Sequence, residues 1–151
     1  MHILIKALTG AFLLLALLPL GAQADDTHLT IQSTNGDHAF TVEVVDTPEA
    51  RAKGLMLRRS LAPDAGMLFD FKESRPVSFW MSNTLIPLDM VFIKADGTVA
   101  NIHADARPMD LTSIPSEGPV MFVLEIPGGR AAELGLAPGD HVVHDRIKSG
   151  T

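Results

Sequence analysis

The stretch MVFIKADGTVANIH, residues 90–103, decides the fold class. Asp96-Gly97 is a strong signal for a two-residue turn, because both central positions of a type I′ turn require a positive φ. Pairing outward from this turn sets Val91 opposite Ile102 and Ile93 opposite Ala100 on one face. On the other face it sets Phe92 opposite Asn101 and Met90 opposite His103. The pattern therefore predicts an antiparallel hairpin.

A second hairpin is predicted at Asn35-Gly36, where the same rule sets Ile31 opposite Phe40 and Leu29 opposite Val42. Further strands are indicated where apolar residues alternate or follow turn signals, at 67–71, 77–81, 120–126 and 141–147. In the strand at 120–126, Val120, Phe122, Leu124 and Ile126 alternate with Met121, Val123 and Glu125. Most of the chain is therefore expected to form short strands.

Two short helices are predicted. Thr47-Pro48-Glu49 is typical of an N-cap, a proline in the first turn and an early acid, with Gly54 as the stop signal. The second helix is expected over 130–136, before the turn Ala137-Pro138-Gly139-Asp140. Many short strands with few helices favour a mainly antiparallel β-sandwich or partly closed barrel, because a parallel α/β sheet needs longer crossover helices.

The first 24 residues are typical of a secretory signal. Lys6 precedes an apolar run over 7–20, and Ala22-Gln23-Ala24 offers small residues for cleavage. We expect a single exported domain over 25–151, secreted or periplasmic, although an uncut membrane anchor is the alternative. Losing Lys6 leaves eleven basic residues against eighteen acidic ones, a net charge of −7 with histidine neutral. This charge argues against nucleic acid as a partner, no second apolar run is long enough to span a membrane, and the lack of cysteine excludes thiol chemistry.

Several short motifs recur in a fixed order that resembles one family. They are Gly54-Leu55-Met56 with Arg58, Gly66-Met67-Leu68-Phe69, Phe79-Trp80-Met81 with Asn83-Thr84, and Pro87-Leu88-Asp89. Val123-Leu124-Glu125 and Gly139-Asp140 follow. In this order they resemble the domain-of-unknown-function family number 192, small proteins that are often exported, from about residue 29 to 143. The resemblance implies a compact, jelly-roll-like β domain and supplies no established activity.

A ligand site is predicted around the only tryptophan. In a strand over 77–81, Trp80 points away from the face that Phe79 and Met81 help to bury. Beyond it, the loop with Asn83 and Thr84 offers hydrogen-bonding groups beside an indole that can stack on a ligand. Arg58 and Asp89 are expected nearby, so the leading hypothesis is a non-enzymatic module for a small polar ligand or an exported protein partner. The structural alternative is that Trp80 fills the second face of the sheet and Asn83 satisfies loop backbone groups.

Two buried acids suggest an enzyme as a second hypothesis. Asp89 and Glu125 both lie in apolar strands, and with His103 they would form a general acid/base set. The structural alternative is neutralisation by Arg58 and Arg107, with an Asp89–Arg107 ion pair as the obvious case. Neither a Gly-x-Ser-x-Gly elbow, a phosphate loop nor a His-Glu-x-x-His pair is present. We therefore expect no catalytic residues.

A copper carrier is the third hypothesis. Met56, Met67 and Met81 each belong to one of the motifs above, and thioethers suit Cu(I). Methionine is also a flexible core filler, so the alternative is that the three serve packing alone. The histidines of 25–151 form no recognised ligand motif. We therefore predict no resident metal or cofactor.

Overall fold

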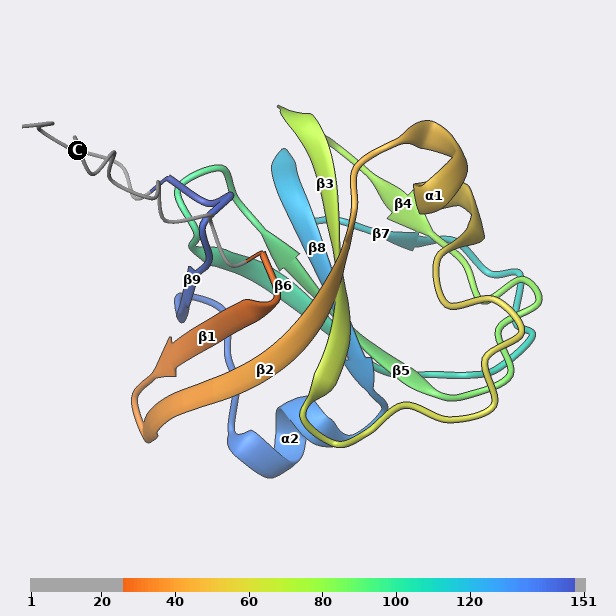
Figure 1. The fold of residues 1–151 in the computed structure, drawn as a ribbon, viewed down its shortest axis with the longest axis horizontal. Coiled ribbons are helices and arrows are strands. Elements are labelled where there is room, and N and C mark those ends of the chain that lie inside the picture. The colour runs from red at the N-terminus through yellow and green to blue at the C-terminus, as the bar shows by residue number, and fades with distance from the viewer. Residues whose placement is uncertain (1–25, 149–151) are drawn as a thin grey trace, which may run out of the picture.

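The computed structural model describes residues 26–148 as one curled β-sheet with a small second layer (Figure 1). The chain forms β1 (His28–Ser33), β2 (Gly36–Val45), α1 (Pro48–Lys53), β3 (Ala65–Arg75), β4 (Ser78–Phe79) and β5 (Leu88–Ile93). It continues through β6 (Val99–Ala106), β7 (Ile114–Pro115), β8 (Val120–Pro127), α2 (Arg130–Leu134) and β9 (His141–Val143). No helix of this part is long and apolar enough to cross a membrane.

The main sheet has seven strands in the order β6-β5-β8-β3-β2-β1-β9, and β4 pairs with β7 in a two-stranded sheet. Its edges approach each other, because Thr98 bridges to His141 and the Val142 amide donates to the Gly97 carbonyl at 2.8 Å. The predicted mainly β fold with two short helices is confirmed, in its partly closed barrel form. One pair departs from the antiparallel expectation, since β2 and β3 run parallel across the crossover that contains α1.

Both predicted hairpins form, with local corrections to register. At 90–103 the outer pairs Val91 with Ile102 and Phe92 with Asn101 are confirmed. Ile93 pairs with Val99 rather than Ala100, because Lys94 and Thr98 close a longer loop and a bulge at Ala100 restores the outer register.

In the first hairpin the turn lies at Thr34–Asn35, so Leu29 pairs with Phe40 and Ile31 with His38. Gly36 stands in the strand opposite Ser33, with φ 128°, rather than in the turn. The shift is even, so the apolar residues keep the predicted face. The last strand is shorter than predicted and ends at Val143.

The sheet buries side chains on both faces. Inside the curl lies a first core cluster that includes Ile31, Phe40, Leu68, Val91 and Leu124. On the other face, the segment with α1, β4 and β7 covers a second cluster that includes Leu55, Met67, Met81, Phe92 and Val123. Figure 1 shows this covering layer beside β3 and β8, away from α2. The candidate site lies in that second layer.

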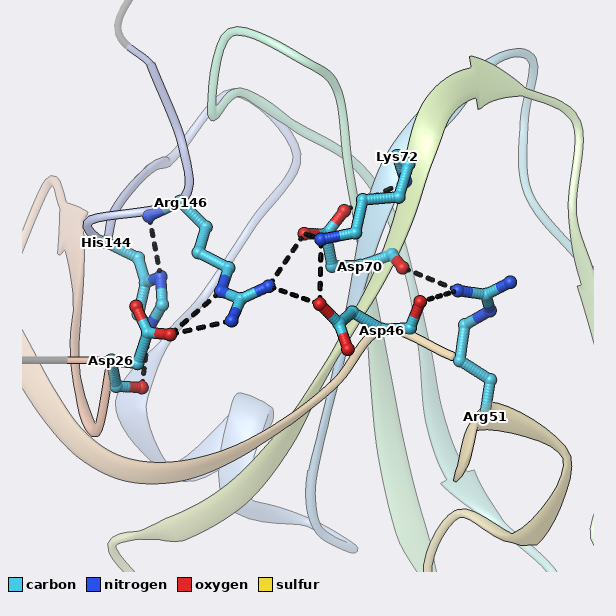
Figure 2. A network of polar contacts seen from close by, with 7 residues as sticks. All are labelled: Asp26, Asp46, Arg51, Asp70, Lys72, His144 and Arg146. Atoms are coloured by element: carbon cyan, nitrogen blue, oxygen red, sulfur yellow. Dashed lines mark hydrogen bonds and ion pairs between the residues drawn. The ribbon is translucent and has the colours of Figure 1, made fainter. Parts of the chain in front are cut away.

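A charged network ties Arg146, near the end of the described range, to the sheet (Figure 2). The Arg146 guanidinium contacts the carboxylates of Asp26 and Asp46 at 2.7 Å each and that of Asp70 at 3.4 Å. Lys72 bonds the same Asp46 and Asp70 carboxylates at 2.8 and 3.0 Å. Arg146 therefore holds the last described residues against Asp46, just after β2, and Asp70, in the middle of β3. Ile147, the next residue, is buried in the first cluster.

Candidate functional site

A pocket of about 340 Å³ opens between α1 and the second face of the sheet. This is near the lower end of the size range of small-molecule sites. Its lining comes from α1 and the residues after it, from β3, from β4 and the loop after it, and from β8. The lining residues are Pro48, Arg51, Ala52, Lys53, Gly54, Leu55, Met56, Phe69, Phe71, Ser78, Phe79, Trp80, Thr84 and Glu125.

The end of α1 shapes one wall of this pocket. Thr47 caps the helix by accepting from the Ala50 amide at 3.2 Å, and Gly54 ends it with φ 47°. A side chain at Gly54 would place its Cβ 3.1 Å from Cζ of Phe69, so glycine lets the chain pass close to the ring. The predicted cap and stop are therefore confirmed, and the stop forms part of the site.

Trp80 stands at the mouth of the pocket with 56% of its surface exposed. Its neighbours Val77 and Met81 are buried, while Phe79 is half-buried. The predicted outward orientation of the indole is confirmed, and the alternative of a sealed core tryptophan is wrong. Trp80 also lines a second, smaller pocket of about 210 Å³ with Leu111 and Ser113.

Phenylalanine rings form the apolar wall. Phe79 meets Phe69 edge-to-face at 5.0 Å between ring centroids, and it meets Phe71 and Phe92 in the same manner at 6.1 Å. The guanidinium groups of Arg51 and Arg75 lie over Phe71 at 5.1 and 5.2 Å from the ring centroid. Arg51 also donates to the carbonyls of Asp46 and Asp70, at 2.7 and 2.9 Å, which holds its charge at the rim.

Glu125 lies at the floor of the pocket with only 5% of its surface exposed. It stands on β8 between Met67 of β3 and Met90 of β5, and burial raises the pKa of its carboxyl to about 8. Within residues 26–148 its carboxyl has no hydrogen-bond partner. Every fully buried side-chain nitrogen or oxygen atom of that range has a hydrogen-bond partner. The carboxyl of Glu125 has none, so its oxygens are not fully buried, and they open onto the pocket that the residue lines.

The loop after β4 is fixed by backbone bonds to two other loops. The Leu57 amide donates to the Asn83 carbonyl at 2.9 Å, and the Met109 amide donates to the Thr84 carbonyl at 3.1 Å. Leu57, Asn83 and Met109 all have positive φ, at 63°, 52° and 64°. These backbone angles are uncommon for residues other than glycine, so the three loops constrain one another around Trp80 and Thr84.

Of the five predicted ligand-binding residues, Trp80 and Thr84 line the pocket. Thr84 is buried, and its hydroxyl donates to the Ser82 carbonyl at 3.1 Å, which leaves the oxygen able to accept. Asn83 is exposed and lies outside the lining, where its left-handed backbone makes the turn. Arg58 also lies outside, because it forms a bidentate pair with Glu43.

Asp89 was misplaced by the sequence argument. It is fully buried, and its carboxylate accepts three backbone amides, from Asp105 at 2.7 Å, Gly129 at 2.9 Å and Ala131 at 2.7 Å. The predicted ion pair with Arg107 is therefore wrong. Since Gly129 has no capping side chain, Asp89 satisfies the amides at the start of α2 instead.

The enzyme hypothesis required Asp89, Glu125 and His103 to share one cleft. Asp89 pairs with Ile126 and faces the first core cluster, whereas Glu125 pairs with Met90 on the opposite face. His103 is exposed on β6, two strands from Glu125. The structure therefore does not bring these three groups together. Nor do Arg58 and Arg107 neutralise the two acids, as the structural alternative had expected.

The three methionines of the copper hypothesis do not share a site in the pocket either. Met67 and Met81 are buried in the second core cluster, while Met56 lines the pocket. The two buried thioethers are not part of the pocket lining, so an ion entering the pocket would meet Met56 alone. In the described part of the chain, no three His, Cys, Asp or Glu residues are grouped to hold a metal.

Sequence reasoning missed Arg51, Phe71 and Phe79 as parts of the site. One face of β3 was identified from the alternation of Met67, Phe69 and Phe71. Phe79 was expected only to be a buried residue on one face of its strand. What the sequence did not supply was the crossover that sets α1 over that face. Glu125 was recognisable in the sequence as an acid in an apolar strand. It was expected to be neutralised by an arginine, but Arg58 binds Glu43 instead.

Comparison with known proteins gives a family model and two solved structures. The model for DUF192, described as "Uncharacterized ACR", matches residues 30–144. A protein from Sinorhizobium meliloti 1021, provisionally described as a transcription regulator, is 45% identical with a TM-score of 0.78, over 80% of this chain and 94% of that one. A protein of unknown function from Novosphingobium aromaticivorans DSM 12444 is 46% identical with a TM-score of 0.76, over 77% and 83%. No protein with a curated description matches the chain.

Proposed function

This chain belongs to the family DUF192, and we propose that it is an exported, non-enzymatic binding domain. Its site would be the pocket beneath Trp80. The ligand would be a small molecule, or the end of a partner's side chain, with an apolar body and one polar group. The apolar body would lie against Phe79 and Trp80, and the polar group would meet Glu125.

The observation that carries this proposal is the unpaired carboxyl of Glu125 under an exposed indole. Burial of an acid without a partner costs stability, and both cross-strand neighbours of Glu125 are methionines. An apolar side chain at 125 would serve packing better. A carboxyl held there without a protein partner supports a role in contacting something that enters the pocket.

The arrangement favours binding over catalysis. A general acid needs a second group to activate the attacking species, and among the pocket-lining residues Glu125 is the single acid, with no histidine beside it. DNA is an unfavourable partner for this chain, unlike what the description of the Sinorhizobium protein as a regulator would suggest, because its net charge of −6 opposes contact with phosphates.

A fragment screen by thermal shift tests the proposal. Ligands of this pocket should raise the melting temperature of the natural protein and lose that effect in Trp80→Ala and Glu125→Gln. Leu85→Ala is the matched control, because Leu85 is an exposed apolar residue outside the pocket lining. A screen whose hits all act equally on the three variants would contradict the proposal.

Export needs a separate test, since residues 1–25 lie outside the described range. The expectation is a mature chain that begins at Asp25 and is recovered outside the cytoplasm. N-terminal sequencing of the protein from cell fractions measures this. An intact Met1 terminus in every fraction would contradict it.

A further inference from the structure

We infer that the pocket takes its ligand through a protonated amino group, which pairs with the Glu125 carboxylate and lies against the rings of Phe79 and Trp80. This inference rests on the proposed function, since it names the chemical class held at the same site. The pocket volume of about 340 Å³ suits an alkylamine or a lysine-like side chain rather than a large cofactor.

The lining carries two cations and one acid, so the support for a cationic ligand comes from the unpaired position of that acid and not from the net charge of the pocket. Arg51 and Lys53, both on α1, are the other ionisable residues of the lining. From β3 and β5 the neighbours of Glu125 are Met67 and Met90, and β4 with its loop adds only uncharged groups. Within the described residues neither cation of α1 forms an ion pair or hydrogen bond with the carboxyl, and burial is the cause of its raised pKa. Glu125 therefore has no cationic partner within the described residues, and a cationic ligand would supply one.

Ionising the Glu125 carboxyl for a cationic ligand costs little free energy. At pH 7 an acid with a pKa of about 8 is mostly protonated, so ionising it lowers the binding constant by only about tenfold. An ammonium group at hydrogen-bond distance from a carboxylate in a poorly solvated site gains more than that. A neutral hydroxyl or amide gains a single hydrogen bond. An anion can accept a hydrogen bond from the protonated carboxyl but is repelled by the carboxylate, so its binding should weaken as the pH rises.

The aromatic lining adds a second reason. Cations are attracted to ring faces, and tryptophan gives the strongest attraction. The cluster already holds two cations, because Arg51 and Arg75 lie over Phe71. Phe79 and Trp80 present further ring surface to the pocket, whose lining contains Glu125 as its one acid.

Binding of this kind must release a proton. The Glu125 carboxyl gives its proton to solvent, the ligand keeps its own, and the carboxylate–ammonium pair remains in the pocket. For an amine that stays protonated, affinity should rise by up to about tenfold per pH unit while free Glu125 is protonated, and should level off above about pH 8.

The test uses probes of matched size: n-hexylamine, 1-hexanol and hexanoate, with Nα-acetyl-lysine methylamide to represent a partner's side chain. Trp80 is the only tryptophan and the chain has no tyrosine, so its emission reports on the pocket directly. At pH 7 we expect an amine to bind at least tenfold more tightly than the alcohol, and to lose at least tenfold in Glu125→Gln. Binding of hexylamine alone would indicate a free amine, and tighter binding of the lysine derivative a protein segment.

Controls separate the possible failures. Glu117→Gln, at an exposed acid, should leave amine binding unchanged. If the alcohol or hexanoate binds as tightly as the amines, or if affinity does not depend on pH, the inference is overturned while the pocket remains a ligand site. If no probe binds but other fragments do, the inference is again overturned. If neither probes nor fragments bind, the proposed function fails with it.

Discussion

Asp89 of β5 and Glu125 of β8 lie on paired strands, yet they face opposite sides of the sheet. Three backbone amides satisfy the Asp89 carboxylate, whereas the Glu125 carboxyl has no partner in the described range. Both are acids in apolar strands, and they look alike in the sequence. Their hydrogen bonding gives them different roles. Asp89 joins the Asp105 backbone to the start of α2, whereas Glu125 opens into a pocket.

Replacing Asp89 with asparagine should destabilise the protein. The amide retains one acceptor oxygen and directs its NH₂ group at a backbone donor, so at least one buried amide loses its partner. We expect a loss of about 1–3 kcal/mol in the free energy of unfolding, measured by urea titration. Asp110→Asn is the matched control, because Asp110 accepts a single amide, from Thr112 at 2.8 Å, at the surface. Equal losses in the two variants would contradict the bridging role of Asp89.

Glu125→Gln should alter how stability depends on pH. Because the folded pKa of about 8 exceeds the ordinary value of 4.5, the folded state holds the extra proton between these values. Its stability therefore falls as pH rises through this window, and the penalty is complete above about pH 8. The variant avoids the penalty, so its advantage should grow with pH to roughly 5 kcal/mol, at 1.36 kcal/mol per pKa unit.

Urea unfolding of both proteins from pH 5 to pH 9 measures this difference. Glu117→Gln should follow the natural protein throughout, since Glu117 is exposed. A constant difference between Glu125→Gln and the natural protein across the range would show that Glu125 is not protonated in the folded state.

Local rules predicted the strands and helices well, because turns and caps depend on neighbouring residues. The cap at Thr47, the stop at Gly54 and the alternation through 120–126 all hold. Register was less secure, since Gly36 entered the strand and Ala100 formed a bulge. A two-residue turn rule contains no information about such bulges.

The site was only partly predictable, because it depends on contacts between distant segments. Trp80 and Thr84 follow from strand alternation and the loop after it. Arg58 lies outside the pocket lining, and Glu43, fifteen residues earlier in the chain, accepts hydrogen bonds from its guanidinium. The Asp89–Arg107 ion pair was wrong because backbone amides rather than a side chain satisfy the Asp89 carboxylate. Every residue type except proline has such an amide, so a sequence cannot show which ones will be used.

Trp80→Ala should leave stability almost unchanged. More than half of the indole surface is exposed, so truncation creates little cavity, and we expect a change of about 0.5–1 kcal/mol. Phe92→Ala is the contrast, because Phe92 is fully buried in the second core cluster and should cost about 3–5 kcal/mol. Circular dichroism in urea measures both, since the first variant has no fluorophore. A cost for Trp80→Ala close to that of Phe92→Ala would mean that the indole is part of the core.

Arg146→Gln should weaken the protein at neutral pH but not in strong acid. Hydrogen bonds from Lys72 and Arg146 lower the pKa of Asp46 from 3.8 to about 2, and Arg146 also lowers that of Asp26. An acid whose folded pKa is depressed stabilises the fold above its unfolded pKa, and this contribution is lost as pH falls through the folded value. The melting temperature of the variant should therefore be lower than that of the natural protein at pH 7. The gap should narrow between pH 4 and pH 2, and with added salt.

Calorimetric melting of both proteins across this pH range is the measurement. Arg59→Gln serves as the control, because Arg59 is an exposed arginine outside the network of Figure 2. Hydrogen exchange adds a local readout, since loss of the Arg146 contacts should speed exchange at Ile147, whose amide donates to the His144 carbonyl at 2.8 Å. A gap of the same size at pH 2 and pH 7 would mean that the Arg146 side chain acts by packing over the first core cluster. In that case the carboxylates of Asp26 and Asp46 would not be what holds the chain end in place.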